Sequence, residues 1–226
     1  MQNRKKQIKH YTNLLKENEI LLLKSSDSYF KNHYSSSPLA KLTGFLGSEG
    51  EAIINKDGEI QIFVDTRYHL LVDKQVYSDI KIYKMELGET FFEAFKKMYK
   101  KNTILHVLQD INFKKYLEYD KYFDLRKYEL KNKYLKNKDI NKKAKIFKIS
   151  EDLKSPSFVQ KIEKLKKTYK NITKTIIFNL DEISYLTNLR CFQMANSSNF
   201  ASILFLDFKN KNYILFADNL SKKNKN

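Results

Sequence analysis

The sequence predicts an α/β protein built of two domains in tandem, and three observations support this prediction. Hydrophobic residues make up 42% of the 226 positions, which is enough for a sizeable core. Segments with the period of a strand alternate with segments that have the period of a helix. The order helix, strand, helix, hairpin in the second half loosely repeats the first half. The stretch 113–143 between them is rich in Lys, Tyr, Asn and Asp and only weakly periodic, so we expect domain I at 1–140 and domain II at 141–226.

Domain I is expected to begin with a helix and then to alternate strands with helices. Apolar Ile8, Tyr11 and Leu15 recur at the spacing of an amphipathic helix, and the apolar run ILLLK follows as a strand. Two further strands flank Asp57-Gly58, a pair that accepts the positive φ angles of a tight hairpin turn. The expected order is helix 3–17, strand 20–24, hairpin 51–65, helix 66–77, strand 80–85, helix 89–101, strand 103–107, and a closing helix with a linker within 113–143.

Domain II is expected to repeat this alternation. Its first long helix begins after Ser155-Pro156, a pair that helix starts favour. The polar tail LSKKNKN follows a strand directly, where a layered domain would still need a covering element, so we expect domain II to be incomplete. The expected order is strand 145–149, helix 157–170, strand 175–179, helix 180–190 and hairpin 201–217 with its turn at 209–212.

The charge of the chain is strongly positive, because 43 Lys and Arg face 26 Asp and Glu and give a formal net charge of +17. A polyanionic partner such as nucleic acid is one interpretation. The lysines, however, run through the whole chain together with abundant Asn, Ile and Tyr, which indicates a biased composition instead of a basic patch. Nucleic-acid binding is therefore the least favoured of the functions considered.

The segments that would direct the chain out of the cytoplasm are missing from this sequence. The opening MQNRKKQIKHY is charged and lacks the apolar stretch of a signal peptide, and no apolar run approaches the roughly 20 residues that span a bilayer. The single cysteine, Cys191, excludes an internal disulfide and is expected to be a buried, inert thiol. We expect a cytoplasmic protein without a membrane partner.

Residues that could catalyse a reaction or hold a metal are not grouped in this sequence. The four histidines, at positions 10, 33, 69 and 106, are scattered, and the acidic residues occur mostly as helix partners of lysine. We predict no catalytic residue and no metal ligand in this chain. His106 lies in an apolar strand and is expected to be a hydrogen-bonded core residue, whereas His69 is expected to be partly exposed.

The stretch LTGFLGSEG contains three of the five glycines of the chain, at positions 44, 47 and 50. It is neither a dinucleotide fingerprint nor a P-loop, because a strand and not a helix follows Gly50. From the residues alone, these glycines allow a sharp turn and close packing of another element.

Three segments in the same order resemble the N-terminal half of the Xaa-Pro aminopeptidases (aminopeptidase P), within the creatinase and prolidase group. They are LTGFLGSEG, VDTRYHLLVDKQV and, further along, LDEISYLTNLR. The sequence departs from the family pattern at Glu49, where Ala is usual, at Thr66, where Gly is usual, and over 191–196. The residues that match the family motifs are Gly44, Phe45, Gly47, Ser48, Gly50, Asp65, Arg67, Tyr68, Asp181, Glu182, Asn188 and Arg190.

The resemblance implies two tandem creatinase N-terminal-like domains, each a mixed sheet flanked by helices. The catalytic pita-bread domain of the family, which holds two divalent metal ions (Mn or Zn), has no counterpart in this sequence, so the chain alone is expected to be inactive. The resemblance further implies a substrate peptide with proline at its second position, and a homodimer. A stand-alone binding or regulatory module derived from the same family is the alternative.

Arg67 is the residue that the resemblance places nearest to a substrate, since the first domain of relatives covers the active-site cleft. Its guanidinium could pair with a carboxylate or carbonyl of a peptide. The alternative is that Arg67 pairs with an acid of its own domain, Asp65 or Glu51, and the sequence leaves both readings open.

Overall fold

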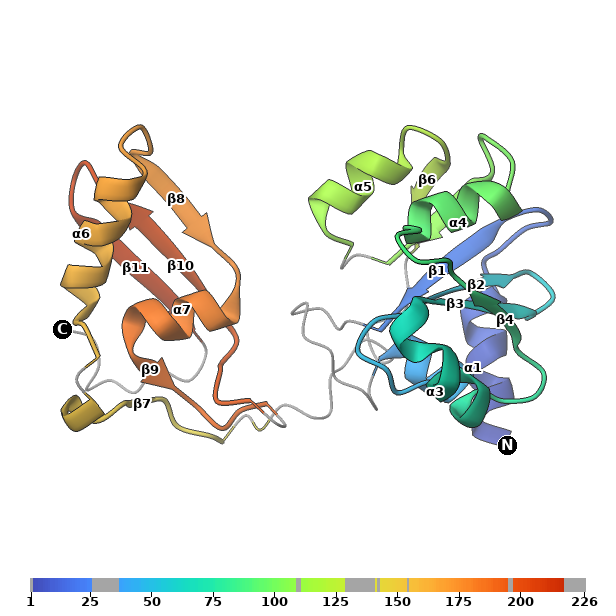
Figure 1. Cartoon of the computed structure of the whole chain (residues 1–226), viewed down its shortest axis with the longest axis horizontal. Helices are drawn as coiled ribbons and strands as arrows, with labels where there is room; N and C mark the ends of the chain where they lie inside the picture. The colour runs from blue at the N-terminus through green and yellow to red at the C-terminus, as the bar shows by residue number, and fades with distance from the viewer. Residues whose placement is uncertain are drawn as a thin grey trace. The chain divides into compact units, whose positions relative to one another are not determined.

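The computed structural model describes residues 2–25, 37–108, 111–128, 141, 143–153, 155–194 and 197–217. The chain divides into two compact units, unit 1 at Met1–Asn137 and unit 2 at Lys138–Asn226 (Figure 1). Helices and strands are combined in both units, which confirms the predicted α/β class.

Unit 1 is built on a six-stranded mixed sheet with the strand order β4-β3-β2-β1-β5-β6. The pairs β1–β2 and β2–β3 are antiparallel, whereas β3–β4, β1–β5 and β5–β6 are parallel. Its elements are α1 (Gln2–Thr12), β1 (Ile20–Lys24), α2 (Pro38–Thr43), β2 (Glu51–Asn55), β3 (Ile60–Val64), the 3₁₀ turn η1 (Thr66–Tyr68), α3 (His69–Gln75), β4 (Lys81–Lys84), α4 (Phe91–Met98), β5 (Ile104–Val107), α5 (Phe113–Tyr119) and β6 (Asp124–Lys127).

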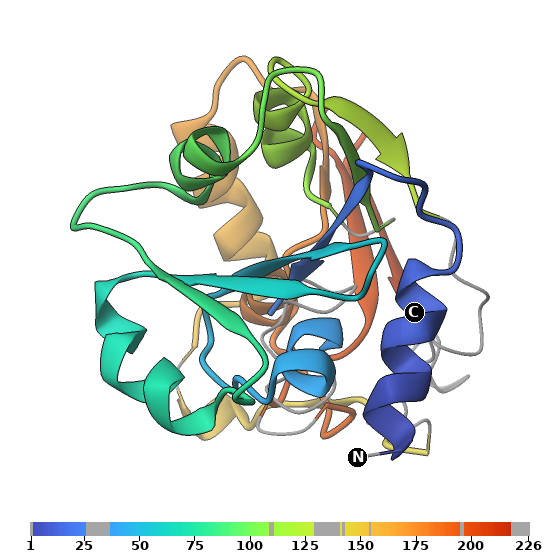
Figure 2. The same ribbon diagram turned by 90° about the vertical axis from the view of Figure 1, so that its right-hand side faces the viewer.

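Helices cover both faces of this sheet, as Figure 2 shows for unit 1. On one face, side chains of α1, α2 and α3 pack with Leu21, Leu23 and Ile62. On the other face, α4 and α5 pack with Leu22 and Phe63. Because β1 is buried on both sides, its sequence reads as a continuous apolar run and not as an alternation.

Most of the expected elements of unit 1 form, and the hairpin turn has Gly58 at a φ of 84°. The segment 113–143 differs, because a strand, β6, follows α5 where only a helix and a linker were predicted. This strand is polar and lies at the edge of the sheet, so it carries no apolar alternation. The short helix α2 was not predicted either, and the part of the expected helix and linker that falls at 129–140 lies outside the described residues.

Unit 2 contains a three-stranded antiparallel sheet, β11-β10-β8, and a small second sheet of β7 and β9. Helix α6 begins with a capping box between Ser157 and Gln160. The elements are β7 (Phe147–Lys148), the 3₁₀ turn η2 (Glu151–Leu153), α6 (Phe158–Thr168), β8 (Lys174–Ile177), α7 (Leu180–Thr187), β9 (Leu189–Arg190), β10 (Ser202–Asp207) and β11 (Asn212–Ala217).

The helix predicted at 180–190 is too long, because α7 ends at Thr187. Asn188 follows with a φ of 57°, a left-handed conformation that stops a helix and that asparagine tolerates better than most residues. The next two residues form β9 and pair with β7.

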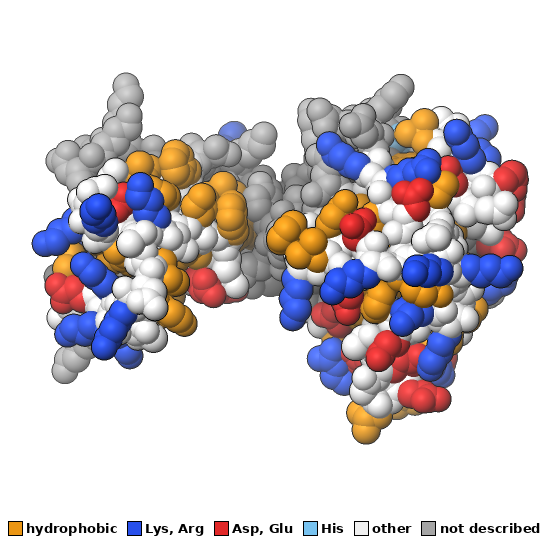
Figure 3. All heavy atoms as spheres, turned by 90° about the horizontal axis from the view of Figure 1, so that it is seen from above, with side chains coloured by type: hydrophobic (Ala, Val, Ile, Leu, Met, Phe, Trp, Pro, Cys, Tyr) orange, Lys and Arg blue, Asp and Glu red, His pale blue; other side chains and the backbone are white. Residues whose placement is uncertain are grey.

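Two surface properties bear on possible partners. In the part of the chain that the structure describes, every helix is too short or too polar to cross a bilayer. Lysine and arginine side chains are spread over the visible face of both units with acidic side chains among them (Figure 3).

Candidate functional site

The glycine-rich loop of unit 1 wraps around one buried ring. Gly44 ends α2 with a φ of 82°, and its N–H donates to the carbonyl oxygen of Ala40. Gly47 and Gly50 both lie against Phe45, so that a Cβ added at Gly47 would be 2.2 Å from Cζ of that ring. Phe45 is fully buried. Glycine is therefore required at position 47 by close packing and at position 44 by the backbone conformation.

The loop is bound to the segment that carries Arg67. The hydroxyls of Ser48 and Tyr68 are hydrogen-bonded at 2.5 Å, and the rings of Phe45 and Tyr68 meet edge to face with centroids 5.6 Å apart. The structure thus brings together two motifs that lie in separate stretches of the sequence. Their contact fixes the position of η1.

Arg67 forms an ion pair with Asp65 on the surface of unit 1. Nη2 of Arg67 is 2.6 Å from Oδ2 of Asp65, and Nε also donates to this carboxylate. The hydrogen bond from Arg67 lowers the pKa of Asp65 and, in return, raises the pKa of Arg67. The Arg67 side chain is nevertheless 67% exposed, so its guanidinium remains accessible.

Glu51, the other acid considered for Arg67, has different partners. Its side chain is only 3% exposed and pairs with the ammonium group of Lys115, while the hydroxyl of Tyr119 donates to Oε2 at 3.1 Å. Burial raises the pKa of Tyr119, which keeps this hydroxyl a donor. The sequence did not reveal this cluster, because both partners lie in the segment after residue 113, where the periodicity is weak.

The motif residues of unit 2 form hydrogen bonds at both ends of α7. Asn188 donates from Nδ2 to the carbonyl oxygen of Pro156 at 2.9 Å, and its Oδ1 accepts from Ser155 and Lys161. Arg190 donates to the carbonyl oxygens of Ser184 and Leu189. Asp181 accepts from Nδ2 of Asn199, and the backbone N–H of Glu182 donates to Oδ1 of Asn179. The contacts of Asn188 and Arg190 hold the turn after α7 in place, whereas those of Asp181 and Glu182 lie in the first turn of the helix.

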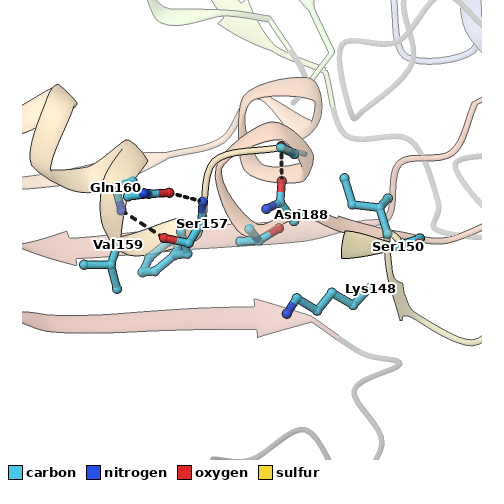
Figure 4. Close-up of a pocket in the computed structure, with 10 residues that line it drawn as sticks. Lys148, Ser150, Ser157, Val159, Gln160 and Asn188 are labelled. Atoms are coloured by element: carbon cyan, nitrogen blue, oxygen red, sulfur yellow. Dashed lines mark hydrogen bonds between the residues drawn. The ribbon is translucent and has the colours of Figure 1, made fainter. Parts of the chain in front are cut away.

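A pocket of about 530 Å³ lies where α6 begins in unit 2 (Figure 4). Its lining includes Lys148, Ser150, Ser157 and Asn188. The polar groups at its wall are largely bonded to one another: Ser157 and Gln160 close the capping box, and Ser155 donates to Asn188. The exposed lining of the pocket is more apolar than polar, and the polar groups named here are already hydrogen-bonded.

His106 and Cys191 have structural roles in the interior of the protein. His106 is hydrogen-bonded through Nε2 to Oε2 of Glu19 at 2.9 Å, which confirms the predicted core role. Cys191 is buried as expected, and burial raises the pKa of its thiol. Among the residues that the structure describes, no three His, Cys, Asp or Glu side chains are grouped so that they could hold a metal ion. The described residues therefore do not fit the metal pair that the family resemblance implies for a full-length enzyme.

Most of unit 2 is similar to one known family. The model of the Creatinase/Prolidase N-terminal domain matches residues 136–225. Those residues are therefore similar in sequence to a creatinase/prolidase N-terminal domain. The match ends near the last residue of the sequence and begins close to the boundary between the two units.

Solved structures extend the likeness in fold to the whole chain. The X-prolyl aminopeptidase from Caenorhabditis elegans, described as a cytosolic enzyme with a di-nuclear active site, superposes with a TM-score of 0.80 at 15% identity. The match covers 97% of this chain and 40% of that one. At this identity it establishes the fold alone, and this chain spans well under half the length of that enzyme.

Two other matches are weaker. The N-terminal domain of a putative metallopeptidase from Corynebacterium diphtheriae is 21% identical over 56% of this chain and 91% of its own, with a TM-score of 0.41. The Xaa-Pro dipeptidase from Bacillus anthracis is 16% identical over 81% of this chain and 48% of its own, with a TM-score of 0.43. Both TM-scores are low, so the fold assignment rests on the first match. No curated protein is similar enough in sequence to count as a match.

Within unit 2, Lys161 is a buried cation. It is 5% exposed, and Nζ donates to the carbonyl oxygen of Tyr185 and to Ser155 and lies over the Tyr185 ring. Among the described residues it has no carboxylate partner. Burial, together with nearby Arg190, lowers the pKa of Lys161.

We expect the stability of this domain to rise with pH because of Lys161. Between the lowered pKa in the folded state and the ordinary value of 10.5, the unfolded state binds more protons, so the free energy of unfolding increases with pH. Lys161→Met is expected to remove this part of the pH slope in the range just below pH 10.5. Chemical denaturation of both proteins over that range tests it, and equal slopes would contradict the assignment to Lys161.

Proposed function

We propose that this chain is the non-catalytic N-terminal part of an Xaa-Pro aminopeptidase, an enzyme that removes an N-terminal residue preceding proline. The observation that carries the proposal is the fold of the whole chain, which matches 40% of an X-prolyl aminopeptidase while the described residues offer no metal site. In this proposal the two units shape the substrate cleft and the subunit contacts. The metallopeptidase part contributes the metal pair, and the assembly is cytoplasmic and homodimeric.

Arg67 is the residue of this chain that we assign to the substrate cleft. Its ion pair with Asp65 and the Ser48–Tyr68 hydrogen bond hold it in place, while the side chain stays 67% exposed. A guanidinium held in this way has a donor edge left for a carboxylate or carbonyl group of a bound peptide. The role of Arg67 is thus to orient a peptide and not to take part in bond cleavage.

The native mass of the protein tests the proposal directly. An antibody against this chain should detect a species far heavier than 27.0 kDa in the source cell, because the metallopeptidase part belongs to the same enzyme. The purified 226-residue chain should not cleave a peptide with proline at its second position. Metal-dependent cleavage by this chain alone would overturn the proposal.

A second candidate is a stand-alone binding or regulatory module derived from the same family. A native species of 27.0 kDa that co-purifies with a separate metallopeptidase would favour it. Binding of nucleic acid is the third and weakest candidate, since only the net charge of +17 supports it. If such binding were lost at moderate salt and showed no sequence preference, it would be nonspecific attraction between the positive chain and the phosphates.

Arg67→Ala in the native enzyme is expected to lower kcat/KM for an Xaa-Pro peptide about tenfold, mainly through KM, because one charge-assisted contact to the peptide is lost. Steady-state kinetics measure this. Arg126→Ala is the matched control, since Arg126 pairs on the same unit with Asp124, two residues before it, at 2.8 Å. Equal kinetic effects of the two substitutions would contradict the assignment of Arg67 to the substrate cleft.

A further inference from the structure

Glu49 is an acidic residue of the glycine-rich loop whose carboxylate has no partner. It is exposed, and among the described residues its side chain makes neither a hydrogen bond nor an ion pair. The other acids beside this loop are neutralised. Asp65 is paired with Arg67. Glu51 is paired with Lys115, the second cation close to Glu49. Glu49 therefore adds an uncompensated negative charge to the surface around Arg67.

Hydrogen bonds hold the backbone on both sides of Glu49. The carbonyl oxygen of Ser48 accepts from the hydroxyl of Ser25 at 3.1 Å, and that of Gly50 accepts from the N–H of Ser25 at 3.1 Å. The hydroxyl of Ser48 is bonded to that of Tyr68. Because the loop is fixed at these points, a ligand that pairs with Glu49 does not have to order the backbone, which avoids an entropic cost of binding.

The same contacts place Glu49 next to Arg67. Ser48, whose hydroxyl is 2.5 Å from that of Tyr68, directly precedes Glu49 in the chain. Arg67 directly precedes Tyr68. The electrostatics agree, because the hydrogen bond to Asp65 raises the pKa of Arg67 most and the negative charge of Glu49 adds to this rise. A ligand held by Arg67 therefore lies close to the carboxylate of Glu49.

The part of a peptide that lies here follows from the role proposed for Arg67. A guanidinium that pairs with the carboxylate of a short peptide binds the C-terminal end of that peptide. An Xaa-Pro aminopeptidase removes only the first residue, so this end lies beyond the proline. The side chain nearest to Arg67 and Glu49 is then that of the residue after proline.

We propose that Glu49 determines specificity in the peptidase and favours a lysine or arginine directly after proline. The carboxylate of Glu49 pairs with the cationic side chain, while Arg67 pairs with the carboxylate of the peptide. Two opposite charges side by side on the protein thus match the two charges at the end of such a peptide. The inference rests on the proposed function, because it requires Arg67 in the substrate cleft. It concerns a position where this sequence departs from the family pattern, in which Ala is usual.

Two tripeptides that differ in charge at the third residue test this inference in the native enzyme. We expect kcat/KM for Ala-Pro-Lys to exceed that for Ala-Pro-Gln about three- to fivefold at low salt, the effect of one exposed ion pair. Glu49→Gln should abolish this preference, mainly through KM for Ala-Pro-Lys, without changing the melting temperature. Glu49→Lys should reverse the preference in favour of Ala-Pro-Glu. High salt should weaken both effects, because the charges are exposed to solvent.

Glu17→Gln is the matched control for Glu49→Gln. Glu17 is also an exposed glutamate of unit 1, but it precedes β1. Glu49 lies beyond the opposite end of that strand, where Lys24 is paired with Glu51. Glu17→Gln should therefore leave the preference between the two tripeptides unchanged. Equal changes in the two variants would show a general effect of net charge and would overturn the inference.

The outcomes also separate this inference from the proposed function. The inference alone is overturned by an active Xaa-Pro aminopeptidase that is impaired by Arg67→Ala but keeps the same preference between the tripeptides in Glu49→Gln. A native species of 27.0 kDa without a peptidase partner overturns both.

Discussion

Replacing Gly47 with alanine is expected to lower the free energy of unfolding of unit 1 by about 2–3 kcal/mol, as measured by chemical denaturation. The new Cβ would lie 2.2 Å from Cζ of Phe45 and 2.9 Å from Cδ1 of Tyr68. Neither ring can move away easily, because Phe45 is fully buried and the Tyr68 hydroxyl is bonded to Ser48. The substitution should also displace η1 and with it Arg67.

Gly88→Ala is the control for this prediction. Gly88 also lies in unit 1 and has a φ of 86°, but no atom lies within 4 Å of the position of an added Cβ. Only backbone strain opposes this alanine, with a cost of about 1 kcal/mol. A loss of stability at Gly47 no larger than at Gly88 would show that close packing around Phe45 is not what requires glycine in the loop.

The sequence predicts the elements whose signals are local. Asp57-Gly58 predicts the turn between β2 and β3, and Ser155-Pro156 predicts a helix start close to that of α6, whose N-cap in the structure is Ser157. Strand β6 was not predicted because its polar sequence has no apolar alternation. It forms at the edge of the sheet through hydrogen bonds to β5. The end of α7 escaped because the left-handed conformation of Asn188 depends on contacts with Pro156 and Lys161, which are distant in the sequence.

The candidate site was likewise predicted only in part from the sequence. The glycine spacing and the segment around Arg67 were visible as motifs, but their contact through Ser48 and Tyr68 joins residues 20 positions apart. Asp65 as the partner of Arg67 was one of two open alternatives. The sequence could not choose between them, because the buried position of Glu51 and its pairing with Lys115 follow from how α5 packs on the sheet.

Lys115→Met is expected to lower the free energy of unfolding of unit 1 by about 3 kcal/mol at pH 7, because it removes the ion-pair partner of a buried carboxylate. The Glu51 side chain is 3% exposed and pairs with Lys115, whose side chain is 22% exposed. The hydroxyl of Tyr119 remains as a hydrogen-bond donor to Glu51 but carries no charge. Chemical denaturation followed by circular dichroism measures the loss.

The pH dependence of the same variant distinguishes a charge effect from a loss of packing. An unpaired, buried Glu51 favours protonation, so its pKa in the folded variant lies above that of the unfolded chain. The unfolded state then binds fewer protons, and the stability of the variant falls as pH rises between these two pKa values. The deficit relative to the original chain should therefore be smallest in acid and largest near neutral pH, and a deficit that is constant with pH would indicate packing alone.

Two further variants complete this test. Glu51→Gln combined with Lys115→Met removes both charges, and we expect it to recover most of the lost stability. Lys84→Met breaks a solvent-exposed pair with Asp73, whose side chains are 40% and 48% exposed, and should cost less than about 1 kcal/mol. If the double variant were as unstable as Lys115→Met alone, the shape and hydrogen bonds of the Glu51 cluster, and not its charge, would be what holds α5 against the sheet.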